Sequence, residues 1–304
     1  FVKLLNRAKQ KLFAIREQRI HPERDEKILS SWNALMIRGM AITGRTLNNY
    51  GYIESAEHAL KFLRQTMWKN ERLFATFKDG KAHLGAYLDD YAFLLDAILE
   101  MLQARWCTED LNWACKLADV LLEHFEDKSS GGFYFTANDH EHLIQRPKTL
   151  SDESTPSGNG IAAFALARLG YLLGETKYLE ASERVLQFSG QAISQSPIGH
   201  TSLLNAYEEQ FYAPQIIILR GDVNELTKWQ QACVYGYAPN RLVFAIDSHT
   251  MNLPTALADK KYKESGCEGV TAYVCQGLQC GAPIENLEEL KNVLVKTSIH
   301  PSGY

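Results

Sequence analysis

The chain has 304 residues, of which 45% are hydrophobic and 22% are charged, a composition typical of soluble globular proteins. This excludes a disordered chain, a collagen and a coiled coil, and no run approaches the roughly 20 apolar residues of a membrane span. A net charge of −4 without a basic stripe argues against nucleic acid as the main partner. Because the first residues already lie in an apolar-periodic stretch without an initiator Met, we expect a piece of a longer protein.

The first two thirds of the chain carries apolar residues at helical spacing, arranged as successive helix pairs. The expected helices cover residues 4–15, 28–40, 52–63, 91–102, 111–125, 161–172, 178–188 and 203–212. Asp25 is available as the N-cap of the second helix. Connections within a pair are short and those between pairs are long. Two of the long ones, residues 73–80 and 131–139, are expected to form β-hairpins.

Repeated helix pairs whose inner helices are apolar on both faces must bury them against neighbouring pairs. An α-solenoid usually has regular repeats of about 34 to 47 residues and short loops. The longer, irregular units favour a mainly α fold for residues 1–212, part of an α/α toroid, and long loops would build a site at one mouth of the ring.

The pattern changes after residue 213, and residues 213–304 are predicted to form a small α/β region. Apolar runs at 214–219, 242–247 and 271–275 alternate with expected helices at 224–234 and 286–294, which indicates a mainly parallel sheet. Asp222 and Asp247 follow strand ends, where ligands often bind, although capping of the next element is the preferred interpretation. No glycine-rich phosphate-binding motif follows a strand, so no cofactor is predicted.

The cysteine pattern indicates neither a disulfide scaffold nor a metal centre. Cys275 and Cys280 form a C-x4-C pair, but a second pair of ligands at matching spacing is absent, so no metal site is predicted. With six cysteines in the whole chain, a reducing, cytoplasmic compartment is expected.

Three polar clusters fall at the starts of the presumed inner helices, within residues 21–33, 88–93 and 146–159. In a toroid these starts converge, and carboxylates, cations, amides and aromatic rings together suit a sugar and its acid–base chemistry. The candidate catalytic residues are Asp25, Asp89, Asp90, Asp152 and His200. The candidate substrate-binding residues are Arg24, Trp32, Asn33, Tyr91, Arg146, Lys148, Ser157 and Asn159.

Each cluster also has a structural interpretation. Helix capping would account for Asp25, Asp89 or Asp90, Ser157 and His200. Trp32 lies on an apolar face and fits a core position better than a sugar platform. A structural ion network is the alternative for the charged residues, which would pair Arg24, Lys27, Arg146 and Lys148 with Asp25, Asp89 and Asp152.

Four ordered blocks resemble the spermatogenesis-associated protein 20 family: residues 24–37, 88–94, 146–159 and 271–283. The resemblance implies an N-terminal thioredoxin-like domain followed by a six-hairpin α/α toroid, of which this chain matches the later part. Such toroids are similar to those of N-acylglucosamine 2-epimerases and of toroid glycosidases. The chain departs from the family pattern at Ala34 and at residues 153–155, and the epimerases' catalytic histidine motifs find no match here.

Two functions follow as hypotheses. The first is a carbohydrate-active toroid that isomerises, epimerises or hydrolyses a sugar, with the three polar clusters as its site. The second is a non-catalytic binding or scaffold module that accompanies a thioredoxin-like domain in redox-linked regulation, with Cys275 and Cys280 as the responsive pair. Neither hypothesis involves nucleic acid or a membrane as partner.

Overall fold

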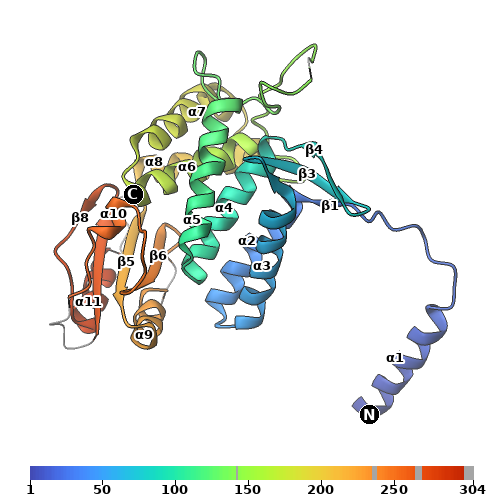
Figure 1. The fold of residues 1–304 in the computed structure, drawn as a ribbon, viewed down its shortest axis with the longest axis horizontal. Coiled ribbons are helices and arrows are strands. Elements are labelled where there is room, and N and C mark those ends of the chain that lie inside the picture. The colour runs from blue at the N-terminus through green and yellow to red at the C-terminus, as the bar shows by residue number, and fades with distance from the viewer. Residues whose placement is uncertain (142, 235–237, 264–268, 298–304) are drawn as a thin grey trace.

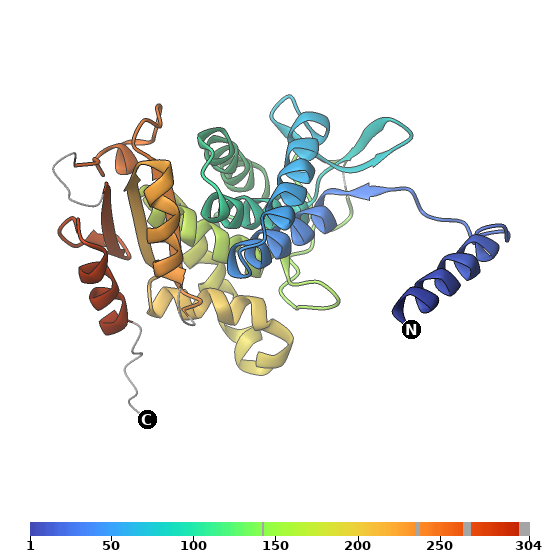
Figure 2. The ribbon, with the colours of Figure 1, turned by 90° about the horizontal axis from the view of Figure 1, so that it is seen from below.

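The computed structural model describes the chain except for residues 142, 235–237, 264–268 and 298–304. Helices form the centre of the molecule, and a small sheet flanked by helices lies at one side (Figure 1). At the other side, helix α1 (Val2–Arg16) stands away from the body on an extended segment (Figures 1 and 2). Every residue of α1 is exposed, and α1 therefore adds nothing to the core.

The helical region is a row of hairpins whose first helices pack side by side. These inner helices are α2 (Ser30–Thr46), α4 (Leu88–Ala104), α6 (Gly158–Leu173) and α8 (Thr201–Phe211). The outer helices are α3 (Tyr50–Phe62), α5 (Thr108–Val120) and α7 (Thr176–Gln195), and α3 and α5 end in the π-helical turns Leu63–Met67 and Leu121–Phe125. The main core lies between the two layers, as expected for helix pairs with apolar inner faces.

Helix α4 has the deepest position in the row. Fifteen of its residues are buried, because it packs between α2 and α6 and against α5. A helix that is apolar around its whole circumference requires such surroundings. The inner position that periodicity predicted for residues 91–102 is therefore confirmed.

One of the two expected β-hairpins forms. Strands β3 (Arg72–Lys78) and β4 (Lys81–Gly85) pair antiparallel, and their turn has positive φ at Asp79 and Gly80. Two short strands, β1 (Ile28–Leu29) and β2 (Trp68–Lys69), extend this sheet. The expectation of a hairpin at residues 131–139 is wrong, because the segment has one isolated bridge, Glu126 to Phe133, and otherwise follows an irregular path.

The C-terminal sheet has the order β6-β5-β7-β8. Its strands are β5 (Gln215–Gly221), β6 (Arg241–Asp247), β7 (Val270–Gln276) and β8 (Gln279–Cys280), with helices α9 (Val223–Val234), α10 (Thr255–Ala258) and α11 (Leu287–Thr297). β5 and β6 are parallel and joined through α9, but β7 is antiparallel to both β5 and β8. The expectation of a mainly parallel sheet is therefore wrong, because β7 enters on the far side of β5 in the opposite direction.

The two faces of β5 alternate between two cores. Ile216 and Ile218 pack into the main core with the helices, whereas Ile217 and Leu219 pack with residues of α9 and α11. A strand buried on both faces appears in the sequence as a continuous apolar run, as residues 216–219 do.

Candidate functional site

The N-termini of the four inner helices lie along one edge of the row, and carboxylates connect their first turns. Asp90 joins α2 to α4: its Oδ1 accepts a hydrogen bond from the Ser31 N–H at 2.8 Å, and its Oδ2 accepts one from the Tyr87 N–H at 2.9 Å. Burial raises the pKa of Asp90 to about 6, against the lowering effect of these N–H donors. Asp90 therefore caps its own helix and the neighbouring one.

Asp152 joins α6 to α8 in the same manner. Its Oδ1 accepts from the Ser157 N–H at 2.8 Å and from the Ser202 hydroxyl, and its Oδ2 accepts from the Thr201 hydroxyl at 2.7 Å and the Ser202 N–H at 2.9 Å. Burial acts to raise the pKa of Asp152, but these hydrogen bonds outweigh it and hold the pKa below its usual value. All of these contacts stabilise the carboxylate form.

Asp89 lies between the other two carboxylates, at the junction of α4 and α6. A Cβ atom at Gly158 would lie 2.2 Å from Asp89 Oδ1, so the carboxyl group rests against the first residue of α6. Among the described residues, no hydrogen bond or ion pair involves this carboxyl group. Burial raises its pKa to about 6, so that the carboxyl group changes its protonation state in mildly acidic solution.

The segment before α6 is held by side chains that the sequence placed in the site. Arg146 donates to the Thr136 carbonyl at 2.6 Å and lies over the Tyr134 ring. Lys148 donates to Asp127 Oδ2 at 2.8 Å and to the Gly131 carbonyl at 2.9 Å. Both cations therefore fix the path of the segment, which explains their recurrence beside helix starts.

Ser157 and Asn159 complete this arrangement at the start of α6. Ser157 is the N-cap, and its hydroxyl donates to the Thr149 carbonyl at 3.1 Å. The buried Asn159 accepts from the Phe133 N–H at 2.7 Å and donates to the carbonyls of Phe133 and Thr149, each at 3.0 Å. These contacts replace the hairpin hydrogen bonds that residues 131–139 were expected to make.

Two residues of the first cluster lie apart from the row. Arg24 pairs with Glu26 and Asp25 pairs with Lys27, all on the exposed segment before β1. The expectation that Asp25 caps the following helix is wrong, because α2 begins at Ser30.

The remaining candidates have mixed positions. Trp32, in the first turn of α2, is 66% exposed, so its expected core position is wrong. Asn33 donates to the Leu29 carbonyl at 2.9 Å. Tyr91 is buried and its hydroxyl accepts from the Leu73 N–H at 2.9 Å. The His200 ring, just before α8, contacts the Ser196 carbonyl through Nδ1 at 2.7 Å.

An aromatic group beside the row was missed in the sequence. The Tyr87 ring, at the N-cap of α4, stacks on Phe135 at a centroid distance of 5.0 Å and lies 5.5 Å from the His140 ring. His140 Nε2 is buried without a hydrogen-bond partner. The available signal was Tyr87 itself, an aromatic residue directly before a cluster of carboxylates.

The buried ion network lies deeper in the helices than the polar clusters. Arg168 of α6 pairs with Glu209 of α8 and with Glu100 of α4, while Arg45 of α2 also reaches Glu100. Of the ion pairs expected around the carboxylates of the three polar clusters, the pair between Asp25 and Lys27 forms, and it lies at the surface. The network thus connects the same four helices as Asp89, Asp90 and Asp152 do, but about halfway along the helices or beyond.

The described residues include no group of three or more His, Cys, Asp or Glu side chains placed to hold a metal ion. Within the same residues, no helix has both the length and the apolar character needed to cross a bilayer.

Comparison with known proteins supports both the resemblance and the fold. No protein-family model matches the chain. Human spermatogenesis-associated protein 20 is 29% identical over 96% of the chain, which spans 39% of that protein's length. A GH76 α-mannanase structure from Bacteroides thetaiotaomicron superposes with a TM-score of 0.50 at 14% identity, over 62% of this chain and 54% of the mannanase. A cellobiose 2-epimerase from Bacillus thermoamylovorans gives 0.46 at 14% identity, over 55% and 45%.

These findings confirm the predicted fold class, part of an α/α toroid of the six-hairpin type with a small α/β region. They also confirm the resemblance that the four sequence blocks indicated. Over 96% of its length, the chain is similar to spermatogenesis-associated protein 20.

Proposed function

We propose that the end of the row where α2, α4, α6 and α8 begin binds a carbohydrate, and that Asp89 is the general acid of a reaction on it. The observation that carries this proposal is the state of Asp89. Its carboxyl group is half-buried, has a pKa of about 6 and makes no hydrogen bond or ion pair with the described residues. A general acid needs a pKa close to the working pH, and burial is the usual means of raising that of a carboxyl group.

The neighbours of Asp89 fit this role. Asp90 is fixed by two backbone N–H donors and supplies a second carboxylate beside the acid. Pairs of carboxyl groups perform glycoside hydrolysis and sugar proton transfer. At the same end, the exposed Trp32 offers an aromatic face for stacking on a pyranose ring. The fold shared with a GH76 α-mannanase is compatible with such a site.

The test is calorimetric titration of the full-length protein with a panel of mono- and oligosaccharides that includes α-mannan fragments. We expect binding by the wild type and by Asp89→Asn, with turnover of a bound sugar lost in the variant. Asp259→Asn, at an exposed position on the C-terminal unit, is the matched control and should behave as wild type. A folded protein that binds no member of the panel would refute the carbohydrate site.

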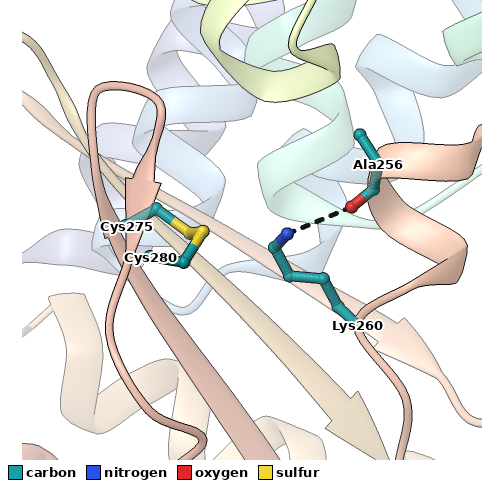
Figure 3. Close-up of a disulfide and its surroundings, with 4 residues drawn as sticks. All are labelled: Ala256, Lys260, Cys275 and Cys280. Atoms are coloured by element: carbon teal, nitrogen blue, oxygen red, sulfur yellow. Dashed lines mark hydrogen bonds between the residues drawn. A yellow bond between two sulfur atoms is a disulfide. The ribbon is translucent and has the colours of Figure 1, made fainter.

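A second candidate function is supported by the disulfide between Cys275 and Cys280 (Figure 3). The bond joins paired residues of β7 and β8, and Cys280 is exposed. The Lys260 ammonium group donates to the Ala256 carbonyl and lines the same small cavity as both cysteines. A disulfide is unusual in the reducing compartment that the cysteine count suggested. The disulfide is therefore the observation that supports our second proposal, a role in redox-linked regulation beside a thioredoxin-like domain.

Reduction by a dithiol tests this alternative. The dithiol would be oxidised to a disulfide while Cys275 and Cys280 each gain a hydrogen. Mass spectrometry of the alkylated thiols measures the reduced fraction of Cys275 and Cys280. We expect a midpoint potential within the range of cellular thiol buffers. Thiols that stay permanently reduced in the purified protein would remove the basis for this candidate, whatever the outcome of the sugar titrations.

A further inference from the structure

A second candidate site lies in the C-terminal α/β unit. A cavity of about 610 Å³ opens where β5 and β6 end, and its wall is formed by Arg220, Asp222, Ser248, His249, Ala258, Lys261 and Tyr262. Ligands of α/β proteins commonly bind beyond the carboxyl ends of parallel strands, and this volume is within the roughly 300 to 1,000 Å³ of small-molecule pockets. The position and the size are therefore those of a binding site.

Arg220 is the unusual residue of this cavity. It is 6% exposed, and among the described residues its Nε and Nη1 groups have no hydrogen-bond partner. Its remaining guanidinium contact is a 3.3 Å hydrogen bond from Nη2 to the Ser248 carbonyl. Burial lowers the pKa of this guanidinium, the opposite of the shift that a paired arginine shows. A buried cation with unsatisfied N–H groups destabilises a protein, so its presence needs a reason outside folding.

The surroundings of Arg220 offset its charge only in part: burial lowers the pKa of the guanidinium more than the nearby Asp247 carboxylate raises it. Asp222 also lines the cavity, but its Oδ1 accepts from the backbone and side-chain nitrogens of Asn224, both at 2.9 Å, and so caps α9. This confirms the capping interpretation of Asp222. No ion pair joins Arg220 to a carboxylate among the described residues. Lys261 adds a second cation at the exposed rim of the cavity.

We propose that this cavity binds the oxyanion of a small ligand, a phosphate or a carboxylate, between Arg220 and Lys261. The guanidinium group offers its unpaired N–H groups in a fork that matches two oxygens of either anion. Because these groups are buried in the unliganded protein, the proposed binding requires a turn about the terminal torsions of Arg220 that brings them to the cavity. The anion then supplies the charge and the acceptors that the protein lacks.

The experiment measures binding to the purified full-length protein by isothermal titration and thermal shift at constant ionic strength, with sodium chloride as reference. The probes are inorganic phosphate, glycerol 3-phosphate and malonate, which distinguish a phosphate from a carboxylate ligand. We expect Arg220→Met to weaken binding of the preferred probe by about tenfold or more, as loss of a charge-assisted hydrogen bond would. Lys261→Ala should also weaken binding, and the exposed Lys228→Ala on α9 should leave it unchanged.

The unliganded Arg220→Met protein gives an independent result. If Arg220 serves a ligand, its replacement by an apolar side chain of similar length should raise the melting temperature. A lower melting temperature with unchanged probe binding would assign Arg220 a purely structural role. Should Arg220→Met fail to fold, Lys261→Ala still decides, because its side chain is exposed: equal binding by wild type and Lys261→Ala, or no binding by wild type, overturns the proposal.

Discussion

Replacing Asp89 by asparagine should stabilise the protein at neutral pH. The folded-state pKa of about 6 lies well above the ordinary value near 3.8, so between these pH values the folded protein binds a proton that the unfolded chain does not. Stability is therefore lost as the pH rises through this window, and the whole cost is present above pH 6. At about 1.4 kcal/mol per pKa unit, the cost is at most about 3 kcal/mol.

The assay is urea unfolding of wild type and Asp89→Asn at several pH values between 4 and 7.5. We expect the two proteins to have nearly equal free energies of unfolding at pH 4, and the variant to gain as the pH rises, up to about 3 kcal/mol above pH 6. Asp259→Asn serves as the control for replacing an exposed aspartate. A variant that is less stable than wild type at pH 7, or a difference that does not change with pH, would refute the reasoning.

Three further substitutions test the contacts around the row. Asp152→Asn should destabilise by roughly 1–3 kcal/mol at pH 7, because the carboxylate accepts four hydrogen bonds from the starts of α6 and α8; equilibrium unfolding measures the loss, and an unchanged midpoint contradicts it. Gly158→Ala should also destabilise, since its Cβ would meet Asp89 Oδ1, and a double-mutant cycle with Asp89→Gly should show coupling between the two sites. Arg168→Leu should lower stability by about 3–5 kcal/mol, because Glu209 is left as a buried charge and Glu100 keeps its ion pair with Arg45 alone; a loss below 1 kcal/mol would show that water reaches Glu209.

The helices could be predicted from the sequence because their signal is local. Apolar residues at helical spacing identified α2 to α8, and the apolar run of residues 214–219 identified β5. The start of α2 could not be predicted, because the Ser31 N–H in its first turn donates to Asp90, 59 positions away, and not to the nearby Asp25. The segment around Gly131 and Gly132 looked like a hairpin, but Asn159 takes the hydrogen bonds that a partner strand would have made.

For the candidate site, the sequence could indicate which carboxylates lie near one another but not their partners. Polar clusters at three helix starts indicated that α4, α6 and their neighbours present carboxylates at one end, and Asp89, Asp90 and Asp152 do lie there. Which carboxylate is free depends on partners that residue spacing does not reveal. Neighbouring aspartates in the sequence, Asp89 and Asp90, differ by one position on a helix and hence point to different neighbours.

The contrast among these three carboxylates is the strongest argument for a function at this end of the molecule. Asp90 and Asp152 each accept hydrogen bonds from the first turns of two helices, and helix capping is sufficient to explain them. Asp89 has the same position relative to α6 but accepts none, and its charge is unfavourable because it is partly buried. Folding alone would favour an asparagine or a smaller residue there. Asp89 is therefore the one of these three carboxyl groups whose presence helix capping does not explain, and chemistry on a bound ligand supplies the missing reason.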